Sequence, residues 1–129
     1  MNRSVVVTGL GVVGPAGAGR AAFESWLAAG TILNKEIDRS AGHHRSGGAR
    51  EALLVGALDL TPWVPAMTAR RMSPPARYAL AAARMALDDA SLGLDHPSLS
   101  QAAVMMATAF GPSSFTEKLL SGILLEGPE

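Results

Sequence analysis

The feature that most constrains the fold is the stretch SVVVTGLGVVG at residues 4–14. Its valines at 5–7 are consecutive rather than alternating, which predicts a strand over residues 4–8 that is covered on both faces. Gly9 and Gly11 then allow a tight turn, or a close approach to another segment where a Cβ would collide. The stretch therefore predicts an α/β fold in which parallel strands are joined by crossover helices.

The same glycines, Gly9, Gly11 and Gly14, spell the G-x-G-x-x-G pattern of dinucleotide-binding proteins. That pattern holds a pyrophosphate only where the turn opens directly into a helix. Pro15 follows the third glycine, and it would remove a hydrogen bond from a helix that began at Gly11. A structural strand and turn is the favoured interpretation, and a nucleotide-binding module is the alternative.

Composition narrows the function classes. The 129 residues carry 11 basic and 11 acidic side chains, so overall charge favours neither nucleic acid nor a membrane as partner. No cysteine is present, which excludes disulfides, thiolate metal sites and a cysteine nucleophile in this sequence. His43 and His44 are adjacent and lack further ligands nearby, so we expect no metal and no cofactor. Without a secretory pattern or an apolar run of ~20 residues, the prediction is a cytoplasmic protein.

The first predicted helix covers residues 21–29, with Phe23, Trp26 and Leu27 on one face and Gly30 as its terminator. We expect Trp26 to be a core residue. The polar residues 31–48 read as a surface loop.

The second predicted helix, over residues 74–90, is the strongest. Its alanine content is high, Ser73 suits the N-cap, and Pro74 suits the first helical position. The many alanines suggest close neighbours on more than one side. Gly93 is expected to end this helix.

Charge on this helix runs against the helix dipole. Arg70, Arg71 and Arg77 cluster at its positive end, whereas Asp88 and Asp89 lie at its negative end. One interpretation is a solvated surface. The other is that the arginines serve a partner that carries negative charge.

Two further apolar runs complete the pattern. Residues 52–60 suit a short strand or extended segment, and residues 103–110 suit a second strand that is buried on both faces. Capping-box spacing at Ser114 predicts a last helix that runs to about residue 125. With only two confident strands, sheet edges and faces are left uncovered, which indicates the opening section of something larger.

We therefore predict that the chain is one N-terminal segment of an incomplete domain, with three regions. Residues 1–30 hold a strand, the glycine turn and a short helix; residues 31–72 form an irregular excursion; residues 73–129 hold the long helix, a strand and a helix.

Four motifs, in this order and spacing, resemble the N-terminal portion of β-ketoacyl-[acyl-carrier-protein] synthases, the condensing enzymes of fatty acid and polyketide synthesis. They are VVVTGLGVVGPAGAG, AFESWLAAG, RRMSPPARYALAAARMALDDASL and AVMMATAFGPSSFTEKLLSGILLEGPE. The resemblance covers nearly the whole chain and is poorest over residues 31–48. It implies a partial thiolase-like fold, namely the start of its N-terminal αβαβα half.

In the full-length enzyme, the resemblance implies acyl transfer and decarboxylative Claisen condensation. A cysteine takes the acyl chain from a carrier protein, and two histidines help a malonyl group to lose CO2. This sequence has no cysteine, and His43 and His44 match no catalytic position. We therefore assign no catalytic residue and predict that the chain alone is inactive.

Two other roles follow from the resemblance. Arg70 and Arg71 occupy the basic segment that docks the acidic acyl carrier protein, and Phe115 and Thr116 match the start of a helix that lines the acyl pocket near the dimer interface. Family members often carry an acidic residue where Ser73 lies, so local contacts there are expected to differ. In the full-length context the resemblance implies a homodimer or a ketosynthase partner. The alternative function is a short non-catalytic subunit that pairs with a full ketosynthase or carrier protein.

Overall fold

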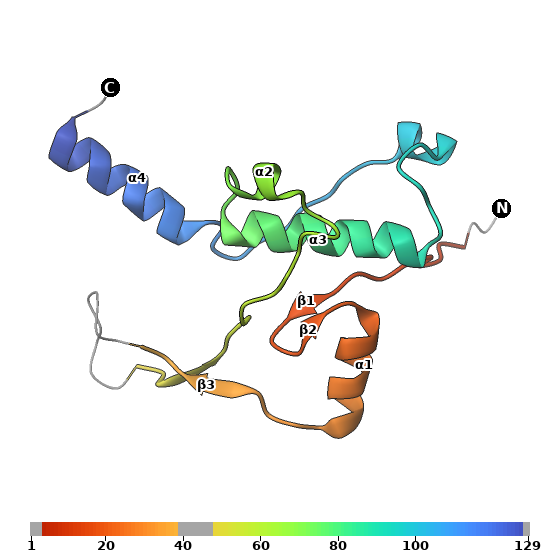
Figure 1. Cartoon of the computed structure of the whole chain (residues 1–129), viewed down its shortest axis with the longest axis horizontal. Helices are drawn as coiled ribbons and strands as arrows, with labels where there is room; N and C mark the ends of the chain where they lie inside the picture. The colour runs from red at the N-terminus through yellow and green to blue at the C-terminus, as the bar shows by residue number, and fades with distance from the viewer. Residues whose placement is uncertain (1–3, 39–47, 128–129) are drawn as a thin grey trace.

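The structure is a computed structural model that describes residues 4–38 and 48–127 (Figure 1). Its helices and strands are short except for α3 and α4. In chain order they are β1 (Val13–Gly14), β2 (Gly17–Ala18), α1 (Arg20–Ala29), β3 (Asn34–Glu36), β4 (Glu51–Leu53), α2 (Ala66–Ala69), α3 (Pro74–Asp89), the 3-10 helix η1 (Pro97–Gln101) and α4 (Ser113–Glu126).

The N-terminal glycine segment lies directly against α3. A Cβ added to Gly9 would lie 2.1 Å from the carbonyl oxygen of Ala86, and one added to Gly11 would lie 1.8 Å from that of Ala82. Both obstacles are helix backbone, and the helix presents only alanine methyl groups beside them. The expectation of a close approach at these glycines is confirmed, because a Cβ at either position would collide with the backbone of α3.

Asp89 joins the same two segments to α1. Its carboxylate accepts a hydrogen bond from the Leu10 backbone N–H at 2.9 Å, and lies 3.6 Å from a guanidinium nitrogen of Arg20. Arg20 also pairs with Glu24 at 2.6 Å, and that hydrogen bond, followed by the charges of Glu24 and Asp89, raises the pKa of Arg20. An acidic residue at the unfavourable end of α3 thus has a structural function.

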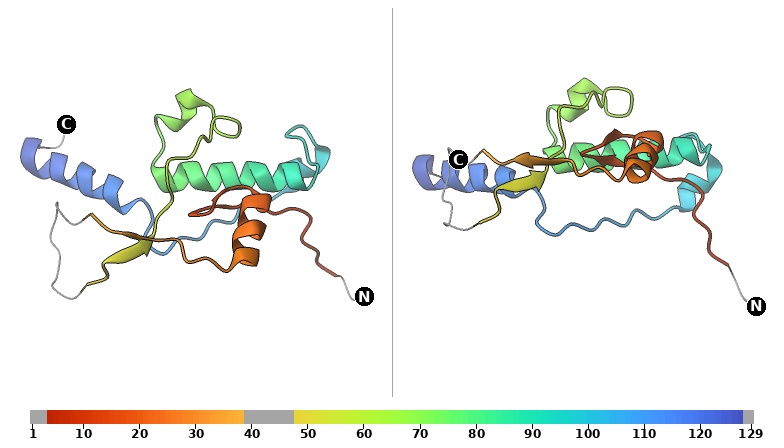
Figure 2. Two further views of the ribbon diagram at one scale, coloured as in Figure 1. Left: turned by 60° about the horizontal axis from the view of Figure 1, so that its bottom comes forward. Right: turned by 90° about the horizontal axis from the view of Figure 1, so that it is seen from below.

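The buried core is small. Among the described residues, the buried hydrophobic side chains are Val64, Ala81 and Met85, with Leu60, Trp63, Leu80 and others packed partly against them. The chain exposes 10809 Å². A compact monomer of 13.3 kDa exposes roughly 6,500 Å². Much apolar surface therefore remains open to solvent, and in Figures 1 and 2 α4 projects from one end of the molecule.

The fold is mixed α/β, but the predicted parallel strands are not found. Both sheets in the described residues are two-stranded and antiparallel. In the first, Val13 pairs with Ala18, and in the second, Asn34 pairs with Leu53. β1 and β2 are joined by a short turn, which allows only antiparallel pairing, whereas parallel pairing needs a long crossover.

The two strands predicted to be buried, over residues 4–8 and 103–110, are wrong for this structure. Neither segment is in a strand, and Val5 and Met105 are 95% and 93% exposed. Figure 2 shows residues 102–110 returning from η1 to α4 as a separate, unpaired segment. A strand takes its backbone hydrogen bonds from a neighbouring strand, and no described segment supplies them here.

The helices agree well with the sequence. The predicted helices at 21–29, 74–90 and 114–125 are present as α1, α3 and α4, and Gly30 ends α1 in the left-handed conformation at φ 61°. Leu27 is 59% exposed, so it does not share the packed face of α1 with Phe23 and Trp26.

Some helix ends differ from the prediction. The N-cap of α4 is Pro112 and Ser114 lies inside the helix, so the predicted capping box is wrong. Ser73 is the N-cap of α3 but forms no side-chain capping bond. Ser91, not Gly93, ends α3: it takes the left-handed conformation at φ 57°, and the Leu92 N–H donates to the Leu87 carbonyl at 2.8 Å. This is a Schellman-type ending.

The predicted loop over residues 31–48 contains β3, which pairs with β4 to form a hairpin, so this part of the prediction is wrong. His43 and His44 lie outside the described residues. The apolar run at 52–60 is a strand only as far as Leu53. The short helix α2, directly after Pro65, was not predicted.

Candidate functional site

The arginines at positions 70 and 71 lie in the tight turn that joins α2 to α3. The Arg70 N–H donates to the Ala66 carbonyl and the Arg71 N–H to that of Thr68, both at 3.2 Å. These bonds fix the backbone of the turn, while both arginine side chains remain exposed. The turn therefore presents two guanidinium groups from a defined position just before α3.

An open groove of about 540 Å³ lies between this turn and the start of α4. We call it the basic groove. Four of its lining residues carry positive charge and none carries a carboxylate. The lining residues are Arg70, Arg71, Met72, Ser73, Pro74, Arg77, Ser114, Phe115 and Lys118.

The positive charge of the basic groove is not neutralised within the described residues. Arg70, Arg71 and Lys118 form no ion pair there, and Arg77 donates through Nε to the Met72 carbonyl at 3.0 Å, which is a neutral partner. Neither α3 nor α4 has an acidic residue in its first turn or a side-chain cap at its start. Both helix dipoles add positive potential at the groove. It is therefore suited to an anionic partner.

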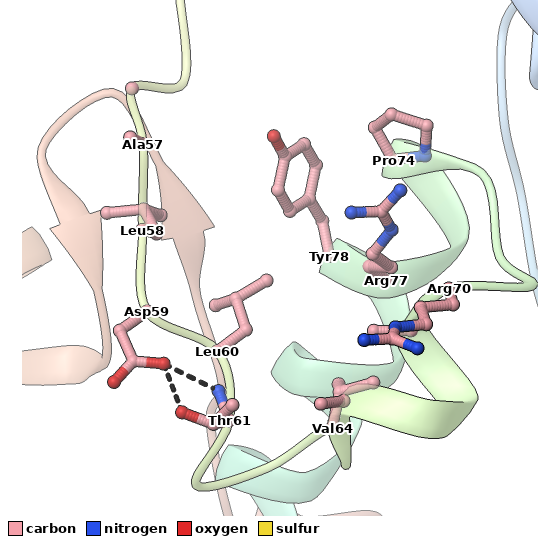
Figure 3. Close-up of a pocket in the computed structure, with 13 residues that line it drawn as sticks. Ala57, Leu58, Asp59, Leu60, Thr61, Val64, Arg70, Pro74, Arg77 and Tyr78 are labelled. Carbon is pink, nitrogen blue, oxygen red and sulfur yellow. Dashed lines mark hydrogen bonds between the residues drawn. The ribbon is translucent and has the colours of Figure 1, made fainter.

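A second open groove, of about 560 Å³, lies on the other side of the same turn (Figure 3). One wall is the extended segment with Leu58 and Leu60, and the facing wall is α3 with Arg77 and Tyr78. Arg70, Pro74 and Arg77 line both grooves.

The carboxylate in this second groove is engaged locally. Asp59 accepts hydrogen bonds from the Thr61 hydroxyl and, at 3.0 Å, from the Thr61 backbone N–H. These bonds stabilise the charged form and lower the pKa of Asp59, with the hydroxyl contributing most. No ion pair between Asp59 and an arginine is recorded among the described residues.

The structure brings together three of the four site residues predicted from sequence. Arg70, Arg71 and Phe115 all line the basic groove, although the family resemblance implies two separate roles for them. Thr116 does not line it, and its hydroxyl donates to the Pro112 carbonyl at 3.4 Å. Sequence reasoning missed Lys118. Its spacing of three residues from Phe115 was the available signal, but the groove itself depends on how α3 and α4 lie in space.

The glycine turn has no features of a nucleotide site. Gly9 and Gly11 face the backbone of α3, and the next helix begins only at Arg20. A crevice of about 180 Å³ between the β1–β2 hairpin and α1 is lined by apolar residues and glycines. There Phe23 and Trp26 lie 5.8 Å apart between ring centroids, and the Trp26 indole N–H donates to the Thr31 carbonyl at 2.7 Å. The geometry supports the structural interpretation.

No helix in the described part of the chain has the length and apolar character needed to cross a bilayer. No group of three or more histidine and acidic side chains in residues 4–38 and 48–127 is placed to hold a metal ion.

Comparison with known proteins identifies relatives of the whole chain. Residues 2–122 match the family described as "Beta-ketoacyl synthase, N-terminal domain". The chain is 28% identical over 131 residues to the 3-oxoacyl-[acyl-carrier-protein] synthase 2 of Vibrio harveyi, covering 98% of this chain and 30% of that protein. Among solved structures it matches the ishigamide ketosynthase/chain length factor, with a TM-score of 0.68 and 30% identity over 95% of this chain and 30% of that one. The chain thus spans 30% of the length of each of these two relatives.

Proposed function

The chain belongs to the β-ketoacyl synthase family through its match to the N-terminal domain, and we propose that it serves fatty acid or polyketide biosynthesis as the N-terminal part of a β-ketoacyl-acyl-carrier-protein synthase. The observation that carries the proposal is the family match over residues 2–122, in a chain similar to a synthase from Vibrio harveyi. Acyl transfer and decarboxylative condensation are then properties of the whole enzyme. A cytoplasmic location is part of the same proposal.

This chain does not perform the condensation by itself. The family's acyl intermediate forms on a cysteine thiolate, and the 129 residues contain no cysteine. Incubation with acyl- and malonyl-carrier protein should give no condensation product above a no-enzyme control. Turnover by the purified chain, with contaminating synthases excluded, would contradict the assignment.

The chain's own contribution is to dock an acidic acyl carrier protein at Arg70 and Arg71. Their exposure, their fixed backbone and the lack of carboxylates in the basic groove support this function. Whole-chain charge is zero, so the attraction is local and acts mostly on the association rate. Each exposed contact contributes about 1 kcal/mol or less, and salt screens it.

The test is a titration of carrier protein against the parent chain and an Arg70→Glu/Arg71→Glu variant, at low and high salt. A matched control, Lys35→Glu/Arg50→Glu, makes the same charge change on the β3–β4 hairpin, away from the groove. We expect weak binding that is lost in the Arg70/Arg71 variant and kept in the control at low salt. Equal affinity of all three proteins, or binding indifferent to salt, would show that these arginines are only a solvated surface.

Phe115 and Thr116 are proposed to line the acyl pocket near the dimer interface of the whole enzyme. Phe115 is 57% exposed, so its ring has surface available for a further contact. Truncation to Phe115→Ala in the full-length enzyme should change the preferred acyl chain length, which an activity assay with carrier-bound acyl chains of increasing length would measure.

A second candidate is a non-catalytic subunit that pairs with a full ketosynthase. The observation that favours it is the apolar surface left open at residues 4–8 and 103–110. Sedimentation of the chain mixed with a full-length ketosynthase distinguishes the two functions. A stoichiometric complex would favour the subunit, whereas independent sedimentation would exclude it.

A further inference from the structure

The basic groove has two walls, and only one of them holds the predicted docking arginines. Arg70 and Arg71 lie on the α2–α3 turn, whereas Lys118 lies on α4, one turn beyond Phe115. Residues three apart on a helix share a face, which is why Phe115 and Lys118 both line the groove. Lys118 therefore places a positive charge opposite the arginines.

We propose that α4 supplies the second half of the docking surface through Lys118, so that acidic side chains of the carrier protein enter the groove between the arginine wall and α4. This rests on the proposed function, in which the carrier is the partner. The groove has a volume of about 540 Å³, which is room for acidic side chains of the partner.

The electrostatics favour carboxylates at this place. The only acidic residue of α4 next to Lys118 is Glu117, which does not line the groove. The uncapped starts of α3 and α4 add positive potential from both sides. A lysine ammonium has three donors and no fixed plane, so it can follow an acidic side chain whose position varies. Lys118 is thus suited to steering and orienting the carrier rather than to tight binding.

The experiment compares Lys118→Glu with Lys35→Glu, a matched reversal on the exposed strand β3, in titrations with apo- and holo-acyl carrier protein. At low salt Lys118→Glu should weaken binding about fivefold, equally for apo and holo carrier, and Lys35→Glu should leave it unchanged. The difference should shrink at high salt. Helix content from circular dichroism verifies folding, and Lys118→Gln replaces the reversal if that variant loses helix.

The outcomes separate this inference from the function on which it rests. If the Arg70→Glu/Arg71→Glu variant loses binding but Lys118→Glu behaves like Lys35→Glu, α4 is no part of the surface and the inference is overturned while docking stands. If neither changes binding, both fail. Binding of holo but not apo carrier would show that the groove recognises the phosphodiester of the prosthetic arm, which also overturns the carboxylate proposal.

Discussion

The glycine segment at residues 4–14 and the segment at residues 103–110 are both rich in apolar residues, but they differ in how closely they pack. The contact around Gly11 is so close that a single added carbon would lie 1.8 Å from a helix carbonyl. In residues 103–110 every side chain is exposed. The difference lies in the neighbours. The glycines let the N-terminal segment pack directly on α3, whereas no segment of the described residues packs on residues 103–110. An apolar run becomes packed structure only where a complementary surface reaches it.

Gly11→Ala tests the packed region and should have the largest effect. The new methyl group would meet the Ala82 carbonyl and the Ala86 N–H, so the N-terminal segment has to move away from α3. We expect the free energy of unfolding to fall by about 3 kcal/mol, the upper end for overpacking. Thermal and urea unfolding followed by circular dichroism would measure it.

Gly14→Ala is the matched control, because nothing lies within 4 Å of a Cβ at Gly14. It should change the free energy of unfolding by less than about 0.5 kcal/mol. Equal losses from Gly11→Ala and Gly14→Ala would mean that the approach to α3 does not hold the fold together.

Asp89→Asn sharpens the comparison by removing the charge that joins α3 to the N-terminal segment. The amide keeps an acceptor for the Leu10 N–H but loses its attraction to Arg20. We expect a loss of about 1 kcal/mol, discounted because the Asp89 side chain is 29% exposed.

Its neighbour Asp88 is exposed and its carboxylate forms no ion pair in the described part of the chain. Asp88→Asn should leave stability unchanged or raise it by about 0.5 kcal/mol, because it removes a negative charge from the negative end of α3. If the two variants behave alike in denaturant unfolding, the role assigned to Asp89 is wrong.

Local signals predicted α1, α3 and α4, and long-range geometry decided most of the rest. Alanine content and Pro74 were enough to place α3 within one residue. The valines at 5–7 equally favoured a strand, but β-propensity describes fit to a half-buried surface and does not supply the neighbouring strand. The antiparallel pairing of β3 with β4 joins segments whose sequences gave little strand signal.

The candidate site shows the same division. Arg70 and Arg71 stood out in the sequence because they cluster at the positive end of the predicted helix over residues 74–90, and they line the basic groove. Lys118 is distant in sequence and has the ordinary appearance of a surface lysine. Its assignment to the groove requires the placement of α4 relative to α3, which no local pattern contains.

Ser91→Gly tests the backbone conformation of the residue that directly follows α3. Ser91 is a non-glycine residue at φ 57°, which glycine adopts without a Cβ penalty. We expect a gain of about 0.5 kcal/mol in the free energy of unfolding.

Gly30→Ala makes the opposite change at the end of α1, because it adds a Cβ where φ is 61°. It should cost about 1 kcal/mol. Scanning calorimetry of both variants would show opposite shifts in melting temperature, and shifts of the same sign would contradict the assigned helix endings.

Val6→Lys and Met105→Lys test the exposed segments and should have the smallest effect on stability. Neither side chain is packed in the structure, so the free energy of unfolding should stay within about 0.5 kcal/mol of the parent. The same changes should lower self-association and the binding of an apolar dye, because they interrupt open apolar runs that other chains can cover. Met85→Lys is the contrasting control. Met85 lies on α3 and is buried in the hydrophobic core, so a charge there should abolish cooperative unfolding. If Val6→Lys or Met105→Lys destabilised the isolated chain as strongly as Met85→Lys, these segments would have to be packed within the chain itself, and the contrast between the two regions would disappear.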